Sequence, residues 1–578
     1  MARSLKIPNS LSASPAQLAG KTDARVRFRP DVWSLLTLLI AGLVALPVIT
    51  VLAHVFVPTG EVWSHLYQTV LRGYVLNTLG LMLGVGFGTL LIGVGTAWLV
   101  VMCRFPGRRI FEWALLLPLA VPTYVIAYAY TDFLQFAGPV QSWLREVFEW
   151  GRDDYWFPNV RSLGGAIVLM SLVLYPYVYL LTRAAFMEQS VCALEVGRTL
   201  GRGPWRLFSS VAVPLARPAI VGGVALALME ALNDFGAVQF FGVDTFTTGI
   251  FRTWFGLGEP AAAAQLAACL LMFVLVLLLL ERFSRRSARF HHTTGRYREL
   301  PQYRLRPARA TVAFLACALP ILVGFLVPAG LLLEMHFRVG DPLMGTRFWE
   351  FAWNSLRLAT VASVVAVGLA VVIGYGVRLK PRALTRAAAR IASVGYAIPG
   401  SVIAVGILIP LGWLDQQINL FSRDRFGVMP GLILTGTMVV LVYAYVVRFL
   451  AVSFNTVEAS LTKVTPNMDA ASRTLGKSPG RTLTLVHLPV MRSSLLAAGI
   501  LVFVDVMKEL PATIILRPFD FDTLAVRAFD LASDERLAQA ATSSLGIVAV
   551  GIVPVILLSI AMRKSRPGGG MAGQKKRC

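Results

Sequence analysis

Long apolar runs are the feature that most constrains the fold of this chain. A helix that crosses the hydrocarbon core of a bilayer needs about 20 mostly apolar residues, and the 578-residue sequence contains twelve such runs. Because 56% of the residues are hydrophobic and the mean hydropathy is +0.67, the chain is far more apolar than a soluble globular protein. We therefore expect an all-α membrane protein with about twelve transmembrane helices. The predicted spans are centred on residues 33–57, 76–102, 111–134, 162–184, 218–240, 260–281, 310–334, 355–377, 391–412, 429–450, 494–516 and 541–562.

One polar segment between these runs occurs twice in the sequence. Residues 198–217 return as residues 473–492, 275 positions later, with nine of twenty positions identical. A repeat this distant predicts two related halves with six spans each. An even number of spans makes the halves parallel, so we expect a pseudo-two-fold axis along the membrane normal with the pathway between the halves. The identical positions in the first copy are Arg198, Thr199, Leu200, Gly201, Pro204, Arg206, Val211, Pro214 and Arg217.

The basic residues predict how the chain is oriented in the membrane. Lys and Arg gather in alternate connections, which include both copies of the repeat, whereas acidic residues gather in the opposite connections. Because cytoplasmic loops carry an excess of Lys and Arg, both repeats and both termini are predicted to be cytoplasmic. The predicted segments are an N-terminal tail at 1–32, a first half at 33–281, a basic linker at 282–309, a second half at 310–562 and a C-terminal tail at 563–578.

The composition also excludes several classes of protein. The net charge of +23 comes from short basic clusters between apolar runs, which a lipid bilayer explains better than nucleic acid. No nucleic-acid partner is therefore expected. The five cysteines have neither the pairing nor the spacing of a disulfide framework or a metal site. They are Cys103, Cys192, Cys269, Cys317 and Cys578.

Each copy of the repeat predicts a helix-turn-helix outside the membrane. A short helix is followed by a glycine turn, at Gly201 or Gly476, and by a second short helix that ends at Pro214 or Pro489. The second helix carries apolar residues, which would form a docking surface in water. A cap on the helical bundle is the purely structural alternative.

The first copy resembles a loop of a known family. The pattern from Glu195 through Gly201 to Pro214 is similar to the EAA loop of permease subunits of bacterial ABC importers. The resemblance implies a type I permease fold, docking to two copies of an ATPase subunit that binds MgATP, and a periplasmic substrate-binding protein. In the second copy the acid position holds Ala470, with Asp469 one residue earlier, which implies a weaker ionic anchor. The predicted docking residues are Glu195, Gly201, Trp205, Phe208, Pro214, Asp469, Gly476, Leu483, Val486 and Pro489.

The segments after the two loops point to a substrate, again by resemblance. Residues 240–249 and 507–513 look like those of fused two-half permeases of ferric iron importers in the bacterial inner membrane. Thiamine permeases share the fused layout, so thiamine or another small solute is the alternative. An outer segment is duplicated as well, and there a binding protein would make contact. Its predicted contact residues are Phe246, Thr248, Arg252, Phe521, Thr523 and Arg527.

Two carboxylates in equivalent positions suggest part of the pathway. Asp234 and Glu509 lie about 16 residues into their predicted spans, about 24 Å from the cytoplasmic end at 1.5 Å per residue. An ionisable group at that depth costs at least about 2.5 kcal/mol in lipid, so both are expected to face a wet cavity or a partner. Oxygen ligands suit a hard trivalent cation. The alternative roles are hydrogen bonding between the halves and an outer gate. The predicted pathway residues are Asn233, Asp234, Lys508 and Glu509.

Nothing in the sequence predicts that the chain hydrolyses ATP. Gly476-Lys477-Ser478 looks like the end of a phosphate-binding loop, but the required glycine five positions earlier is Ala471. We therefore predict no catalytic residues and no cofactor in this chain, with ATP hydrolysed by a separate subunit. A twelve-span secondary transporter driven by an ion gradient is the rival class, against which the duplicated docking loops argue.

Overall fold

The computed structural model describes residues 32–189, 199, 203–286, 302–341 and 345–564. Within these ranges the chain is almost entirely helical, and two-residue strands β1 (Cys103–Arg104) and β2 (Tyr303–Arg304) pair in parallel. Among these residues, eleven helices are long and apolar enough to cross a membrane, and the number is twelve when one bent pair of helices is counted as a span. The predicted all-α membrane fold with about twelve spans is confirmed.

The two halves repeat the same order of helices. Most equivalent helices begin 275 residues apart, as at residues 32 and 307 or 213 and 488. The first half contains α1 (Val32–Ala53), α2 (Glu61–Thr69), α3 (Leu71–Met102), α4 (Arg108–Ala114), α5 (Thr123–Leu134), α6 (Pro139–Phe148), α7 (Leu163–Glu188), α9 (Pro204–Leu207), α10 (Val213–Asn233), α11 (Gly236–Phe240), α12 (Phe246–Phe251) and α13 (Pro260–Arg286). The second contains α14 (Pro307–Ile321), α15 (Val327–Arg338), α16 (Thr346–Leu379), α17 (Ala383–Ala392), α18 (Gly400–Phe426), α19 (Met438–Leu461), α20 (Pro466–Thr474), α21 (Pro479–Thr482), α22 (Leu488–Met507), α23 (Pro511–Leu516), α24 (Leu524–Ser533) and α25 (Leu537–Lys564).

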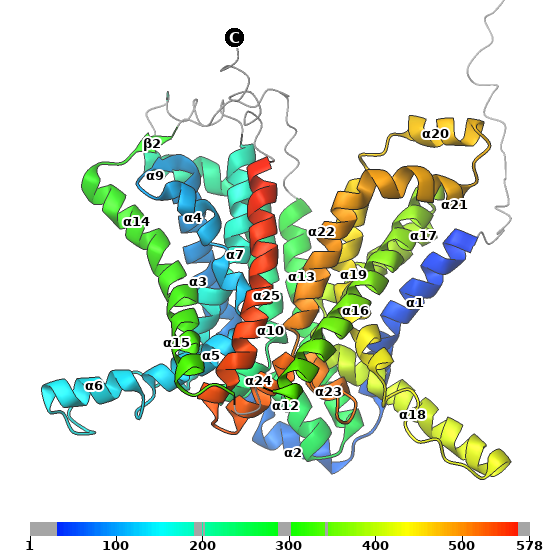
Figure 1. Cartoon of the computed structure of the whole chain (residues 1–578), viewed down its shortest axis with the longest axis horizontal. Helices are drawn as coiled ribbons and strands as arrows, with labels where there is room; N and C mark the ends of the chain where they lie inside the picture. Colours follow the sequence, from blue (N-terminus) through cyan, green and yellow to red (C-terminus); the bar gives the residue numbers. More distant parts are fainter. Residues whose placement is uncertain (1–31, 190–198, 200–202, 287–301, 342–344, 565–578) are drawn as a thin grey trace, which may run out of the picture.

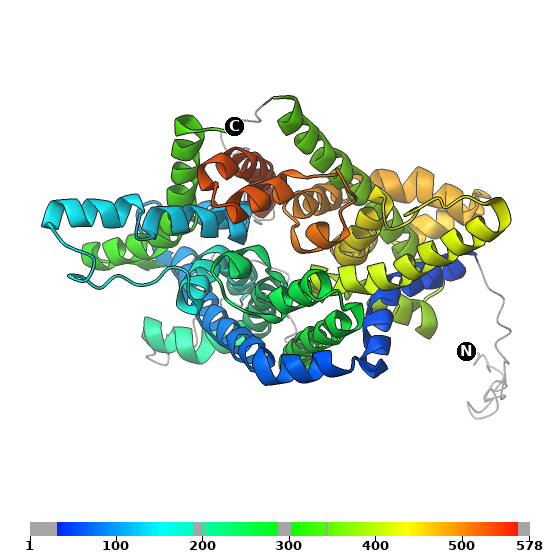
Figure 2. The ribbon, with the colours of Figure 1, turned by 90° about the horizontal axis from the view of Figure 1, so that it is seen from below.

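The long helices are arranged as a V. Figure 1 shows them spread apart at the end that carries α9, α20 and α21, and close together at the end that carries α12, α23 and α24. Seen from below, the short helices of the closed end lie between the two halves (Figure 2). The molecule is therefore closed at one end and divided at the end that carries the repeated loops.

The first helix of each half packs on the other half. Trp33 of α1 lies edge-on to Tyr375 of α16, with the ring centroids 4.9 Å apart. In the opposite direction, Phe314 of α14 packs on Phe111 of α4 at 5.2 Å. The predicted boundaries at 33–281 and 310–562 describe the repeat along the sequence, but in space the two halves exchange their first helices.

Prolines interrupt the third and ninth predicted spans. Pro122 and Pro399 are each in extended backbone immediately before α5 and α18, and the preceding residues Val121 and Ile398 are extended as well. A proline disfavours helical backbone at the residue before it, so the helix breaks there. The span predicted at 111–134 is consequently a pair of helices bent by 88°, and the one predicted at 391–412 begins at Gly400. The two prolines therefore bend the third span and shift the start of the ninth from residue 391 to residue 400.

The predicted proline stops after the docking loops are also wrong. From α9 the chain continues through a π-helical turn, Phe208–Ala212, into α10 as one span that contains Pro214. The second half repeats this with a π turn at Leu483–His487 before Pro489. A proline within a helix lacks one N–H donor and crowds the preceding turn. The wider π turn directly before it accommodates that defect, so the helix bends around the proline without ending.

Candidate translocation pathway and coupling loops

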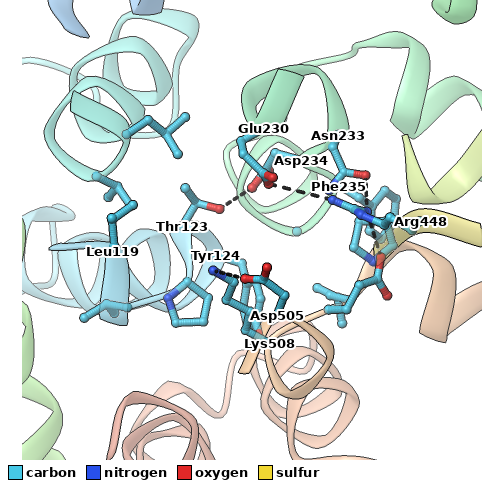
Figure 3. Close-up of a pocket in the computed structure, with 18 of the residues that line it drawn as sticks. Leu119, Thr123, Tyr124, Glu230, Asn233, Asp234, Phe235, Arg448, Asp505 and Lys508 are labelled. Carbon is cyan, nitrogen blue, oxygen red and sulfur yellow. Dashed lines mark hydrogen bonds and ion pairs between the residues drawn. The ribbon is translucent and has the colours of Figure 1, made fainter. Parts of the chain in front are cut away.

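A small polar cavity, of about 80 Å³, lies between the halves near the closed end of the V. Its walls come from α5 and α10 of the first half and from α19 and α22 of the second, and Figure 3 shows the polar side chains that line it. Four carboxylates and two basic groups line this cavity. They are Glu230, Asp234, Asp505, Glu509, Arg448 and Lys508.

The four carboxylates form two pairs related by the 275-residue repeat. Glu230 is equivalent to Asp505, and Asp234 is equivalent to Glu509. Within each half the two acids are four residues apart, or about one helical turn. The cavity therefore has two layers of acidic groups, and each half contributes one acid to each layer.

Asp234 and Glu509 cap the short helices that follow their spans. Asp234 Oδ1 accepts hydrogen bonds from the backbone N–H groups of Ala237 and Val238, at 2.9 and 3.2 Å, while Oδ2 accepts from the hydroxyl of Thr123. Glu509 likewise accepts from the N–H groups of α23, at 3.1 and 3.2 Å. The first N–H groups of a helix have no partner within it, so a carboxylate placed there stabilises the helix start.

The placement of these two acids at the cavity was predicted, but their geometry favours a structural role. Their oxygens are occupied by backbone and hydroxyl donors, and both residues are buried. Among the described residues, the hydrogen bonds of each acid stay within its own half. Capping of the following helix therefore describes both acids better than a cation ligand or the predicted hydrogen bonding between the halves. Among the described residues there is no group of three or more His, Cys, Asp or Glu side chains arranged to hold a metal ion.

Glu230 and Asp505 are the acids that reach the open part of the cavity. The side chain of each is 20% exposed, whereas that of Glu509 is 2% exposed. Asp505 pairs with Lys508 at 3.0 Å, and Glu230 lies 3.7 Å from Arg448. This pair was not among the predicted pathway residues, although both acids share the 275-residue offset and the same charge.

Both basic groups come from the second half. Lys508 occupies the position equivalent to Asn233, and Arg448 the position equivalent to Val173, which also lines the cavity. The acids are thus symmetric between the halves while the bases are not. Arg448 was missed because the repeat gave no counterpart with a similar side chain.

The second copy of the repeat is tied to its own half by a half-buried acid. Asp469 of α20 accepts hydrogen bonds from Arg378 of α16, at 2.9 and 3.0 Å, and its other oxygen lies 2.7 Å from Nε2 of the buried His487. Burial by itself would raise the pKa of Asp469, but the hydrogen bonds and charges of Arg378 and His487 outweigh it and hold the pKa below its ordinary value. Asp469 is therefore an internal tether for α20, so its predicted role as an ionic anchor for a partner is not favoured.

This tether gives a prediction for Asp469→Asn. Because the folded pKa is lowered, the ion pair stabilises the loop above the ordinary Asp value of about 3.9 and is lost as the pH falls through the folded value. At neutral pH the wild-type tether is intact, whereas the amide leaves Arg378 without a charged partner. We expect faster amide hydrogen exchange across residues 466–474 of the variant at pH 7, measured by mass spectrometry. Unchanged exchange would contradict the tether, and Asp424→Asn, at an exposed acid on α18, is the matched control.

The remaining docking residues divide into exposed and buried groups. Trp205 is 75% exposed, whereas Phe208 packs on Trp98 with the ring centroids 4.9 Å apart. Leu483 is buried and Val486 is half-buried, so the apolar surface predicted for the second copy consists instead of Leu475 and Leu485, at 75% and 62% exposure. Gly476 has a φ of +71° and forms the predicted turn. Glu195 and Gly201 lie outside the described residues.

The duplicated outer segment is mostly structural. Phe246 and Thr248 are buried, and Thr248 forms a capping box with Thr245 at the start of α12. Thr523 is the N-cap of α24, where its hydroxyl accepts from the N–H of Val526, and Arg527 lies 3.4 Å from Asp341. These residues are not on a free surface, which corrects their prediction as contact residues. Of the six, Arg252, whose side chain is 47% exposed beside Asp244, and the half-buried Phe521 stay predictions.

Two repeated helical halves that enclose a polar cavity and carry repeated loops at one end define the membrane subunit of a transporter. The chain belongs to the family of binding-protein-dependent transport system inner membrane components, whose sequence model matches residues 89–289. It is a permease subunit of an ABC transporter and a multi-pass inner-membrane protein, as the resemblance predicted. Membership of this family excludes the alternative of a secondary transporter driven by an ion gradient.

Three relatives show how far the similarity extends. The Fe(3+)-transport system permease protein FbpB 2 of Haemophilus influenzae is 26% identical over 540 residues, 92% of this chain and 98% of the relative. The molybdenum transport system permease protein ModB of Escherichia coli is 27% identical over 229 residues, 39% of this chain and 95% of the relative. The probable sulfate transport system permease protein cysT of Chlorokybus atmophyticus is 31% identical over 214 residues, 36% of this chain and 70% of the relative.

Proposed function

We propose that this chain carries ferric iron across the inner membrane. The observation that carries the proposal is the charge of the cavity, where four carboxylates face two basic groups. Such an excess of acid attracts a cation and repels an oxyanion such as molybdate or sulfate. The full-length similarity to an Fe(3+)-transport permease supports the same substrate, since the two other relatives described above match about two fifths of the chain or less.

The proposal includes the partners that drive transport. Two copies of an ATPase subunit, each binding MgATP, dock on the two loops at the open end of the V, and a periplasmic binding protein delivers the substrate at the closed end. Exposed apolar side chains on both loops, Trp205 in the first and Leu475 with Leu485 in the second, support the docking. In this arrangement both termini face the cytoplasm, as the Lys and Arg distribution predicts, and the V is open toward the cytoplasm.

The substrate can be tested through the stimulation of ATP hydrolysis. The chain and its ATPase, reconstituted in nanodiscs, are mixed with a periplasmic binding protein loaded with ferric iron, molybdate or sulfate. We expect ATP hydrolysis to rise several-fold only with the ferric-loaded protein, because productive docking requires the cognate partner. Stimulation by an oxyanion-loaded protein, with none by the ferric-loaded one, would reverse the assignment of the substrate.

The docking role of the second loop predicts the effect of Gly476→Val. A β-branched residue is strongly disfavoured at a φ of +71°, so the turn after α20 must rearrange and displace Leu475. We expect the variant to insert normally but to retain much less ATPase in a pull-down. Gly480→Ala is the control, because a Cβ at Gly480 meets no atom within 4 Å and its φ is not positive. Wild-type ATPase recovery by Gly476→Val would remove this loop from the docking surface.

A further inference from the structure

The closed end of the V is held by a small set of contacts between the halves. Phe235, directly before α11, packs on Phe529 of α24 with the ring centroids 5.6 Å apart. Next to this apolar contact, the side-chain oxygen of Asn233 accepts two hydrogen bonds from the second half. The donors are the backbone N–H of Gly400 and Nη1 of Arg448, each at 2.6 Å.

Arg448 brings a positive charge to these contacts between the halves. It lies on α19 of the second half, and its side chain is only 4% exposed. Its guanidinium bonds to Glu509 of its own half at 3.1 Å, and it reaches across to Asn233 and, at 3.7 Å, to Glu230 of the first half. Figure 3 shows this guanidinium beside Asn233 with a dashed contact to Glu230.

The surroundings leave little room for another arrangement of these groups. A Cβ at Gly400 would lie 2.6 Å from Oε1 of Glu509 and 2.8 Å from Nη1 of Arg448. Only glycine therefore lets the backbone N–H come close enough to Asn233 while Arg448 keeps its place. In the first half, the position equivalent to Arg448 holds Val173. The cavity therefore has one such arginine and no symmetric partner for it.

We propose that Arg448 is a latch between the two halves, which holds the outer gate closed while the V is open at the opposite end. When the halves separate at the closed end, Arg448 must give up Asn233 and Glu230 but keeps Glu509 on its own half. It thus remains paired in both states, and a buried charge is never left alone. The same movement leaves Glu230 without its basic neighbour, so this carboxylate becomes available when the gate opens. The latch itself does not depend on which substrate is carried.

The latch is tested by measuring how often the gate opens. Phe235→Cys is introduced into the full chain after its five native cysteines are replaced by serine, and the complex with its ATPase is studied without ATP in sealed, right-side-out vesicles. A membrane-impermeant maleimide outside the vesicles reacts with Cys at this position only when the gate is open. We expect Arg448→Gln to raise the reaction rate about tenfold, since hydrogen bonds to a charged group contribute to the closed state.

Two further variants separate the latch from a general loss of folding. Asn233→Leu removes the shared acceptor without removing a charge, and we expect it also to increase the rate. Arg183→Gln removes an arginine whose side chain is equally buried, at 4% exposure, and which pairs with Glu112 within the first half; it should leave the rate unchanged. Reaction rates at the parental value in both Arg448→Gln and Asn233→Leu would overturn the proposal, as would an equal increase in Arg183→Gln.

Discussion

Iron uptake by a Glu230→Gln/Asp505→Asn double variant is expected to fall at least about tenfold. The two amides keep the shape of the side chains and remove both charges from the layer of acids formed by Glu230 and Asp505, which we call the open layer because these two side chains are partly exposed in the cavity. Two unit charges about 4 Å apart interact by roughly 4 kcal/mol near a protein surface, whereas a tenfold change in rate needs only about 1.4 kcal/mol. Uptake of labelled ferric iron into vesicles, with the cognate binding protein and ATPase, measures the effect.

The second layer of acids, Asp234 and Glu509, should respond differently to the same kind of substitution. Asp234 and Glu509 cap α11 and α23, so Asp234→Asn/Glu509→Gln is expected to reduce the amount of folded protein more than the uptake per folded molecule. Quantifying the monodisperse fraction by size-exclusion chromatography separates the two effects. If the double amide at Glu230 and Asp505 transports iron normally, or if both layers behave alike, the assignment of the open layer to the pathway is wrong.

A second large effect is expected for stability with Gly406→Ala. Gly406 of α18 faces α1, and a Cβ there would lie 2.3 Å from the carbonyl oxygen of Pro47 and 2.7 Å from its carbonyl carbon. These are backbone atoms, which cannot move aside without displacing α1, and overpacking of this kind costs about 1–3 kcal/mol. We expect a clear fall in the thermal unfolding midpoint of the detergent-solubilised protein.

The same helix offers a matched control for that experiment. A Cβ at Gly412 meets no atom within 4 Å, so Gly412→Ala should leave the midpoint unchanged or raise it slightly, because alanine favours the helix. Equal stability of the two variants would show that α1 does not pack on α18 of the opposite half. The packing of the first helix of each half on the other half would then be contradicted.

This packing of the first helices is the part of the fold that the sequence was least able to predict. Apolar runs identify helices that cross the membrane, and the 275-residue repeat groups them into two halves. A run of apolar residues such as α1, however, carries no information on which helix it will pack against. The breaks at Pro122 and Pro399 were visible as prolines, but whether a proline breaks a helix or is absorbed by a π turn, as at Pro214, depends on the surrounding structure.

The candidate site was predicted in part. Asp234 and Glu509 were correctly placed between the halves, because their shared offset requires equivalent positions. Their role as caps could not be read from the sequence, since it depends on each span ending one or two residues before the acid. Glu230 and Asp505 carry the same signal, since they share the 275-residue offset, but were not among the predicted pathway residues. Arg448 is different: with valine in the equivalent position, the repeat gives no indication of it.

The central claim, that this permease carries ferric iron through an acidic pathway, is tested most directly by transport itself. The chain, its ATPase and the binding protein are reconstituted in proteoliposomes, and uptake of labelled ferric iron is measured in competition with molybdate and sulfate. We predict uptake of iron that requires both ATP and the binding protein and that neither oxyanion reduces. ATP-dependent uptake of an oxyanion with no uptake of iron would contradict the account.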